Sequence, residues 1–302
     1  NYYKSKLASG LKRLIIDYEP PTRHACFCPR CRTAFAKKFG LNTAKIAVMP
    51  PKEILNKPYA AKWGAFRAEQ NGVIVGLHCE IIHSIDPEVK IGLCSWRGTA
   101  TAAANGGDIR LFEPYASWHI PMIYAKGTAY HDSVAETCAR TTKPVLPFLE
   151  LSDLSQPRYL SPAELRMNLL ATGLAGGGGA VLWVGIECLD ADYMAMTARA
   201  VNEIQELRER VPPSKHAPDW VTVAPARTLK RTITVDGKPV EIQPLSVHPH
   251  LRWHVWGDGK RAMVAALNYD LKKNHTLMIR VGDTTRELKV PPADLVSIVV
   301  ER

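Results

Sequence analysis

The sequence lacks long apolar runs, and none approaches the roughly 18 to 20 residues of a membrane-spanning helix. Residues 1–14 are polar and basic, without the apolar core of a signal peptide, so no localisation follows from them. No glycine-rich phosphate-binding fingerprint follows the first predicted strand, which weakens a dinucleotide-binding interpretation. We therefore predict no membrane partner. With 302 residues, of which 46% are apolar, the chain can form a full core in one or two domains.

Arginine-rich runs and the aromatic-basic motifs of RNA-binding proteins are also missing, although the formal net charge is +10. Basic residues are spread along the chain and mixed with acidic ones, as in residues 203–210. Because phosphate binding needs clustered Lys and Arg, we predict no nucleic-acid partner. The main interpretation is a solvated basic surface, and attraction of an anionic substrate or matrix stays open.

Cysteine is sparse, with seven residues, and only Cys26, Cys28 and Cys31 cluster. In the order C-x-C-x-x-C they offer three thiolates that can ligate one zinc, but a fourth ligand is required. His24 or a cysteine from an upstream segment could supply it. The alternative is unligated or disulfide-paired cysteines; a catalytic thiol is not expected, because no activating histidine pairs with a cysteine.

Near-continuous apolar runs alternate with helical stretches between residue 14 and about residue 211. Such runs are typical of parallel strands that are buried on both faces of a sheet. The predicted strands cover residues 14–18, 89–95, 120–125, 145–149 and 180–184. The predicted helices cover residues 29–39, 53–83, 130–140, 161–176 and 191–210, and Ser161 and Glu164 begin the fourth as a capping box. This alternation indicates an α/β fold with parallel strands.

Polar and aromatic side chains end almost every predicted strand: Asp17 and Glu19, Ser95 and Trp96, Tyr124 and Lys126, Glu150 and Asp153, Trp183 and Glu187. A (β/α)₈ barrel assembles its active site from such strand ends, whereas an open sheet concentrates its ligands at one switch point. We therefore predict a (β/α)₈ TIM barrel, of which five strands are present.

The pattern changes after residue 211. A proline-rich linker, PPSKHAPDW, precedes short alternating runs at residues 222–224, 232–235, 240–243, 251–256, 262–268, 275–281 and 295–300. Turn signals between these runs are typical of an antiparallel sandwich. We predict two domains: a barrel portion in residues 1–211 and a β-sandwich accessory domain in residues 212–302.

Two glutamates at strand ends could supply the carboxyl pair of glycoside cleavage. One carboxyl protonates the leaving oxygen, and another attacks or activates water, about 5 to 5.5 Å away in retaining enzymes. Glu19 follows the first strand, and Glu150 ends the fourth. Alternatively, each is a rim carboxylate paired with an arginine such as Arg23 or Arg158. Asp17 points to the same side as Glu19, and their repulsion favours a protonated Glu19.

Aromatic residues at the strand ends suggest a sugar-binding surface. Tyr124 and Trp183 end strands where their rings could stack on a sugar face, although buried aromatic residues are also common at barrel rims. Trp96, Asp153 and Lys126 complete the predicted substrate-binding set.

The segment DYEPPTRHACFCPRCRTAF, residues 17–35, resembles the glycoside hydrolase family 42 β-galactosidases of clan A. The resemblance implies that Glu19 is the acid/base at the end of strand four and Glu150 the nucleophile at the end of strand seven. It also implies a zinc bound by the three clustered cysteines and a fourth, upstream cysteine. The chain departs from that family at Tyr18, where the family has asparagine.

A second resemblance leads to another mechanism. LIIDYEP, MIY and VLWV are similar to the D-x-E, M-x-Y and tryptophan motifs of family 18 chitinase-like barrels, although the full D-x-x-D-x-D-x-E pattern is absent. This similarity implies substrate assistance, in which the acetamido group of the sugar attacks. Asp17 would orient that group, Glu19 would protonate the leaving oxygen, and Tyr124 would steady the acetamido carbonyl.

Both resemblances make the first strand number four, so we expect the chain to hold strands four to eight of a longer barrel. We predict a retaining glycosidase that acts on a carbohydrate and needs no catalytic cofactor. The alternatives are substrate-assisted hydrolysis of N-acetylhexosamine linkages and a non-catalytic carbohydrate-binding barrel. A barrel without three strands exposes two edges, so we also expect poor solubility or homo-oligomers.

Overall fold

The computed structural model describes residues 2–19, 23–24, 26–153, 158–183, 190–211, 217–224, 231–235, 238–242 and 248–302. The chain forms two compact units. The first comprises residues 1–122 and 136–146, and the second comprises residues 123–135 and 147–302. Among the helices of the described part, none is long and apolar enough to cross a membrane.

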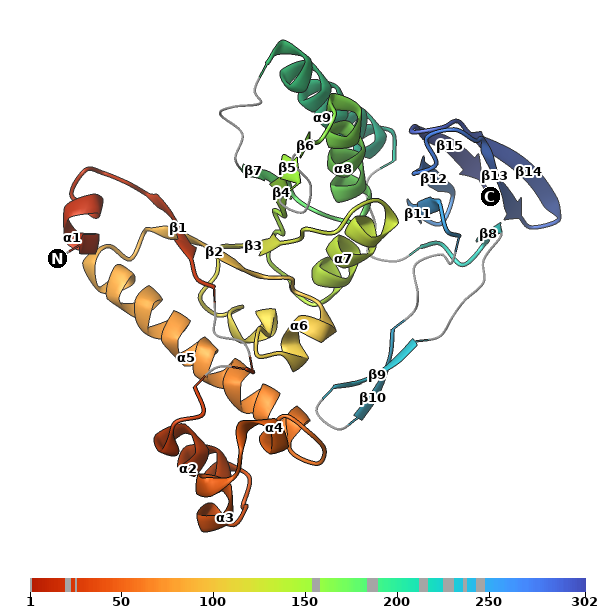
Figure 1. Cartoon of the computed structure of the whole chain (residues 1–302). Coiled ribbons are helices and arrows are strands. Elements are labelled where there is room, and N and C mark those ends of the chain that lie inside the picture. Colours follow the sequence, from red (N-terminus) through yellow and green to blue (C-terminus); the bar gives the residue numbers. More distant parts are fainter. Residues whose placement is uncertain are drawn as a thin grey trace. The chain divides into compact units, whose positions relative to one another are not determined.

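The first unit contains three parallel strands, β1 (Arg13–Asp17), β2 (Lys90–Trp96) and β3 (Trp118–Met122) (Figure 1). The middle of β2 is buried, which fits a strand covered on both faces. The long helix α5 (Ala60–Ile85) connects β1 to β2, and its Val75, Cys79 and Ile82 share one core cluster with residues of β2. The short helix α1 (Tyr2–Leu7) reaches the same cluster through Leu7. Helix α6 (Ala100–Ala104) and the 3₁₀ helix η1 (Ile109–Leu111) precede β3.

A helical module lies between β1 and α5 in the chain. Its helices α2 (Pro29–Lys38), α3 (Thr43–Val48) and α4 (Pro51–Ile54) gather at the N-terminal end of α5 (Figure 1). The module has its own buried cluster of Phe35, Ala36, Ile46, Met49, Ile54, Trp63 and Phe66. We call residues 23–62, which include the first turn of α5, the loop module. The prediction of one helix over residues 53–83 is wrong at its start, because the helix is interrupted around Pro58, which has no amide hydrogen to donate.

The second unit contains the parallel pair β4 (Phe148–Glu150) and β7 (Val181–Trp183). Its helices are α7 (Thr128–Ala139), whose last turn belongs to the first unit, α8 (Pro162–Leu174) and α9 (Ala191–Arg210). The capping box of α8 is confirmed, since Ser161 Oγ accepts from the Glu164 amide and Glu164 Oε2 accepts from the Ser161 amide. The two-residue strands β5 (Ser152–Asp153) and β6 (Arg158–Tyr159) form a small antiparallel pair.

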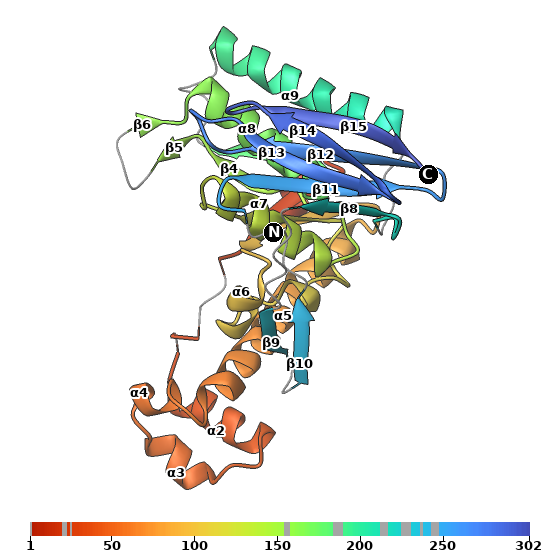
Figure 2. The ribbon, with the colours of Figure 1, turned by 90° about the vertical axis from the view of Figure 1, so that its right-hand side faces the viewer.

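Two antiparallel sheets follow in the C-terminal part of the second unit (Figure 2). One has the order β11 (Leu251–Gly257), β12 (Arg261–Asn268), β15 (Leu295–Glu301), and the other β14 (Thr284–Val290), β13 (His275–Val281), β8 (Val221–Ala224). Apolar residues of both sheets form one core cluster, so the sheets pack as a sandwich. A separate hairpin joins β9 (Arg231–Val235) and β10 (Lys238–Ile242).

The predicted fold class is confirmed. The sheet order β1-β2-β3-β4-β7 is that of a curled, parallel half-barrel of five strands, and antiparallel sheets follow it. The predicted strand over residues 120–125 begins and ends too late, because β3 occupies Trp118–Met122 and residues 123–126 continue as a loop. The division into domains 1–211 and 212–302 stays a prediction.

Candidate active site

The carboxylates Asp17 and Glu19 lie at the carboxyl end of β1, and both side chains are exposed. Asp17 is opposite Cys94 of β2 in the strand register, and the Tyr18 amide donates to the Cys94 carbonyl oxygen at 3.2 Å. Burial raises the pKa of the Cys94 thiol to about 12, and the neighbouring Asp17 and Glu19 add to the rise. Both carboxylates therefore lie close to one buried thiol, on one side of the strand end.

Trp96 ends the adjacent strand β2 and is 41% exposed. Glu19 and Trp96 each lie two residues beyond the Asp17–Cys94 pair, on neighbouring strands. The first unit thus presents an acid and an aromatic ring at one strand-end surface. Such a combination can bind a sugar ring by its apolar face and deliver a proton to a glycosidic oxygen.

Tyr18, between the two carboxylates, contacts α5. Its Oη donates to Asn71 Oδ1 at 3.3 Å, and Asn71 Nδ2 donates to the Gly106 carbonyl at 2.7 Å. Burial raises the pKa of Tyr18, and the positive charge of Arg67 opposes that rise. Sequence reasoning missed Asn71 and Arg67, which are 0% and 5% exposed, because isolated polar residues inside a helical pattern carry no spacing signal.

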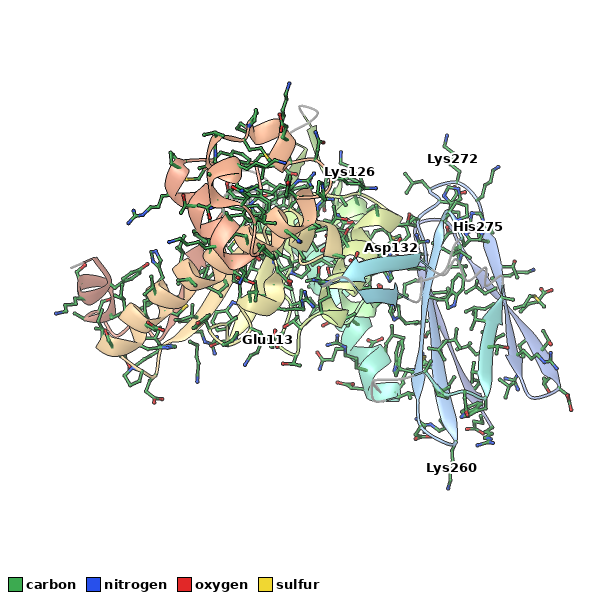
Figure 3. The ribbon with its side chains drawn as sticks, turned by 90° about the horizontal axis from the view of Figure 1, so that it is seen from below. Glu113, Lys126, Asp132, Lys260, Lys272 and His275 are labelled. Carbon is green, nitrogen blue, oxygen red and sulfur yellow. The ribbon has the colours of Figure 1, made fainter. Side chains whose placement is uncertain are left out.

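A small pocket opens at the strand ends of the second unit, with a volume of about 20 Å³, enough for about one water molecule. Its lining residues are Ile123, Tyr124, Ala125, Lys126, Tyr130, Leu149, Glu150, Leu160 and Asn168. The structure thus brings together three of the predicted site residues, Tyr124, Lys126 and Glu150; Lys126 is labelled in Figure 3. Glu150 is half-buried, and Tyr124 is 42% exposed.

The floor of this pocket is held by hydrogen bonds between α7 and α8. Tyr130 is 1% exposed, and its Oη lies 2.8 Å from Thr172 Oγ1. Thr172 Oγ1 donates to the Asn168 carbonyl at 2.9 Å, so Tyr130 is the donor to Thr172. Asn168 lines the pocket together with Glu150, and these hydrogen bonds join α7 to α8 beneath it. Sequence reasoning missed Asn168 because it lies inside a helix rather than at a strand end.

Two predicted residues are placed by their backbone alone. Trp183 pairs with Glu150 in the β4–β7 register, and Asp153 pairs with Arg158 between β5 and β6. The side chains of Trp183 and Asp153 lie outside the described part of the structure. Glu19 belongs to the first unit and Glu150 to the second, so the separation of their carboxyl groups stays a prediction.

The three clustered cysteines are free thiols at the start of α2. The Cys26 sulfur lies 3.6 Å from that of Cys28 and 3.5 Å from that of Cys31, and all three sulfurs lie within 4.8 Å of one another. Sulfurs bound at about 2.3 Å around a tetrahedral zinc are about 3.8 Å apart, so the spacing fits zinc. Among the described residues, the potential metal-binding group consists of these three cysteines, without a fourth His, Cys, Asp or Glu at the same spacing.

The cysteines also differ in acidity. A hydrogen bond from the Cys31 amide lowers the pKa of the Cys28 thiol to about 7, with help from the neighbouring thiols. Burial raises the pKa of Cys31 to about 12, and the other two thiols add to the rise. Cys28 is the N-cap residue of α2, where backbone amides stabilise a thiolate. The lowered pKa of Cys28 favours the thiolate form that a metal ion would need, whereas Cys31 would have to lose its proton on binding one.

A scan against protein-family models and a search of curated proteins find no match. Among solved structures, an apo exo-carrageenase of family GH42 from Bacteroides ovatus is similar over 90% of this chain and 62% of its own, with 11% identity and a TM-score of 0.50. The glycoside hydrolase domain of PgaB (BpsB) from Bordetella bronchiseptica matches over 67% and 58%, with 12% identity and a TM-score of 0.44. A chitinase from Chromobacterium violaceum matches over 66% and 94%, with 10% identity and a TM-score of 0.37.

The chain thus spans about 60% of the length of the first two of these structures. At 11% identity, the likeness to the family 42 structure shows a shared fold and not membership of a family.

Proposed function

We propose that this protein is a glycosidase that cleaves O-glycosidic bonds of an oligo- or polysaccharide by a retaining mechanism with two carboxylates. The observation that carries the proposal is the placement of Glu19 and Glu150 at carboxyl ends of parallel strands, the face on which barrel enzymes build their active sites. The barrel fold shared with an exo-carrageenase supports the class of reaction.

In this mechanism Glu19 donates a proton to the glycosidic oxygen while Glu150 attacks the anomeric carbon. The bond to the leaving sugar breaks, and a covalent glycosyl ester forms on Glu150. Glu19, now ionised, takes a proton from water, which hydrolyses the ester and restores both groups. Tyr124 and Trp96 offer ring surfaces for the sugar, and Lys126 and Asn168 offer N–H donors to its hydroxyl groups.

Zinc has a structural role in this proposal. Cys26, Cys28 and Cys31 would hold the ion together with a fourth ligand, and the ion would fix the start of α2, ten residues after Glu19. The chemistry on the sugar passes through the carboxylates and not through the metal. The loop module would then be positioned by two devices, its apolar cluster and the ion.

The proposal is tested by reducing-sugar release from a panel of oligosaccharides with the full chain and with Glu19→Gln and Glu150→Gln. Each variant is expected to lose at least about a hundredfold in kcat, since general acid–base and covalent catalysis each contribute on this scale. Glu88→Gln is the matched control, because Glu88 is exposed and lies next to the amino end of β2. Binding of sugars without any hydrolysis would instead identify a non-catalytic carbohydrate-binding barrel.

A further inference from the structure

Most of the net positive charge of the protein lies in the loop module. Residues 23–62 contain nine Lys and Arg and one acidic residue, Glu53, which gives +8, compared with +10 for the whole chain. The basic residues are Arg23, Arg30, Arg32, Lys37, Lys38, Lys45, Lys52, Lys57 and Lys62. The other 30 Lys and Arg are spread along the chain and are nearly balanced by 28 acidic residues, so most of the net excess of positive charge lies in one eighth of the chain.

These cations are available at the surface. Arg30 and all six lysines of the module are exposed. Within the described part of the chain, Lys38 pairs with Glu69 at 2.5 Å, and the other six exposed cations form no ion pair. The ammonium groups of Lys38 and Lys62 each lie 5.9 Å from the centre of the Phe39 ring, so one aromatic ring contacts two cations. Unpaired cations in a group repel one another, and an anionic ligand would relieve that repulsion.

The loop module is anchored by a packed aromatic core. Its aromatic core includes the stacked pair Phe27–Trp63 with ring centres 5.0 Å apart, and Trp63 Nε1 donates to the Arg23 carbonyl at 2.7 Å. The module follows the carboxyl end of β1, four residues after Glu19. In barrel enzymes the loops at this face surround the substrate.

We propose that the loop module binds an anionic polysaccharide, through its sulfate or carboxylate groups, and thereby selects the substrate of the adjacent strand ends. This inference rests on the proposed glycosidase function. Lysine ammonium groups are flexible point charges, which suit repeated anionic groups on a chain of variable conformation. The long-range field of the module also draws polyanions to the site.

Nucleic acid is the competing polyanion, and the aromatic residues argue against it. Proteins that bind single strands stack bases on exposed rings. The rings of Phe27, Phe35, Phe39 and Tyr59 are all buried or half-buried, and His24 is the exposed ring among the described residues of the module. One imidazole ring among seven exposed cations is no platform for successive bases, which matches a sulfated or carboxylated sugar chain.

The test compares two triple variants with the same change in net charge. The module variant carries Lys45→Glu, Lys52→Glu and Lys57→Glu. The control variant replaces three exposed lysines of the C-terminal sheets, Lys260→Glu, Lys272→Glu and Lys289→Glu; Figure 3 shows Lys260 and Lys272 pointing outward. Both carry Glu19→Gln, so that hydrolysis cannot consume a probe, and circular dichroism checks that both are folded. The probes are labelled dextran sulfate, alginate oligosaccharides, neutral dextran and a single-stranded DNA oligomer.

The module variant is expected to bind the anionic polysaccharides on the order of tenfold more weakly than the parent, and the control variant less than about threefold more weakly. Preference for dextran sulfate or for alginate identifies the anionic group and supports the proposal. Three results would overturn it. The first is an equal loss of affinity in both variants, the second is that neither polysaccharide binds, and the third is tighter binding of DNA than of the polysaccharides at equal charge. Binding without hydrolysis by the unmodified chain overturns only the glycosidase function; hydrolysis of neutral sugars without polyanion binding overturns only this inference.

Discussion

Arg252 of β11 holds Asp132 of α7 with two parallel hydrogen bonds, from Nε to Oδ1 at 2.6 Å and from Nη2 to Oδ2 at 2.7 Å. The Arg252 side chain is 8% exposed, and its Nη1 also donates to the carbonyl oxygens of His248 and Leu251. Both residues belong to the second unit. The pair therefore ties the helix that begins at the Tyr124–Lys126 loop to the first strand of the β11 sheet.

Replacing Asp132 with Asn should destabilise the protein by about 1 to 2 kcal/mol, because it removes the carboxylate that faces the buried Arg252 charge, although the Asp132 side chain is 40% exposed. Urea denaturation monitored by circular dichroism measures the free energy of unfolding. Asp283→Asn, at an exposed position, is the control and should change it by less than about 0.5 kcal/mol. The double variant Asp132→Asn/Arg252→Gln should lose less than the sum of its single variants. An Asp132→Asn protein as stable as the parent would contradict the role of the pair.

The stability of the protein should fall in acid because of buried histidines. The Nε2 atoms of His131 and His254 lie 3.2 Å apart, and burial lowers the pKa of both, for His254 to about 3. In the first unit, burial lowers the pKa of His119 to about 4. In the unfolded chain these histidines have an ordinary pKa of about 6.5, so below this pH the unfolded chain binds more protons than the folded one. The stability is therefore fully present above about pH 6.5 and is lost as the pH falls toward the pKa values of the folded state.

At pH 5 this linkage amounts to about 2 kcal/mol each for His254 and His119. Urea titrations at pH 7, 6 and 5 measure it. His254→Gln should make the dependence on pH shallower, whereas His83→Gln, at an exposed position, should leave the slope unchanged. A free energy of unfolding that stays constant from pH 7 to 5 would refute the prediction.

Much of the barrel portion could be predicted from the sequence because its elements have strong periodicity. The predicted helix over residues 191–210 has the bounds of α9, and the strand over 89–95 differs from β2 by one residue at each end. β14 was missed because its exposed, charged residues give no apolar alternation. α3 and α4, of six and four residues, are too short for a helical period and are stabilised by the loop-module core.

The site could be predicted in part. Strand ends indicated Glu19, Glu150, Tyr124 and Lys126, because the end of an apolar run is visible in a sequence. The pairing of Asp132 with Arg252, 120 residues apart, depends on how α7 and β11 pack, and no local pattern encodes it. The same holds for Asn168, which reaches the pocket only through the packing of α8.

The zinc site makes a prediction on metal content. Protein purified with zinc should hold about one ion per chain by plasma mass spectrometry, and Cys31→Ser should lose it. Removal of the ion by a chelator should lower the melting temperature of the parent protein. Cys138→Ser, outside the cluster, should keep the ion. A metal-free parent with an unchanged melting temperature would exclude structural zinc.

Glu150 separates the two carbohydrate mechanisms. In the two-carboxylate mechanism Glu150→Gln removes the nucleophile, whereas in substrate assistance the acetamido group attacks and Asp17 orients it. We expect Glu150→Gln to abolish hydrolysis, and Asp17→Asn to have a smaller effect. Azide added to Glu150→Gly should restore turnover and yield a glycosyl azide of inverted configuration. Nearly intact hydrolysis by Glu150→Gln, with loss of activity in Asp17→Asn, would favour the N-acetylhexosamine reaction.

The exposed apolar surface of the first unit should cause self-association. β1 is an edge strand with Ile15 52% exposed, and α5 exposes Val73, Leu77 and Ile81 by 61%, 53% and 51%. The last three are spaced by four residues, so they form one stripe along the helix. An unpaired strand edge beside an apolar stripe attracts another chain.

We therefore expect dimers or larger species of the isolated chain in sedimentation velocity experiments at micromolar concentration. Leu77→Lys/Ile81→Lys should shift the distribution toward monomer, because it places two charges in the stripe. Val48→Lys is the matched control, since Val48 is 80% exposed but belongs to α3 in the loop module. A monodisperse monomer that melts cooperatively would contradict this prediction and would show that the edge and the stripe are tolerated in solution.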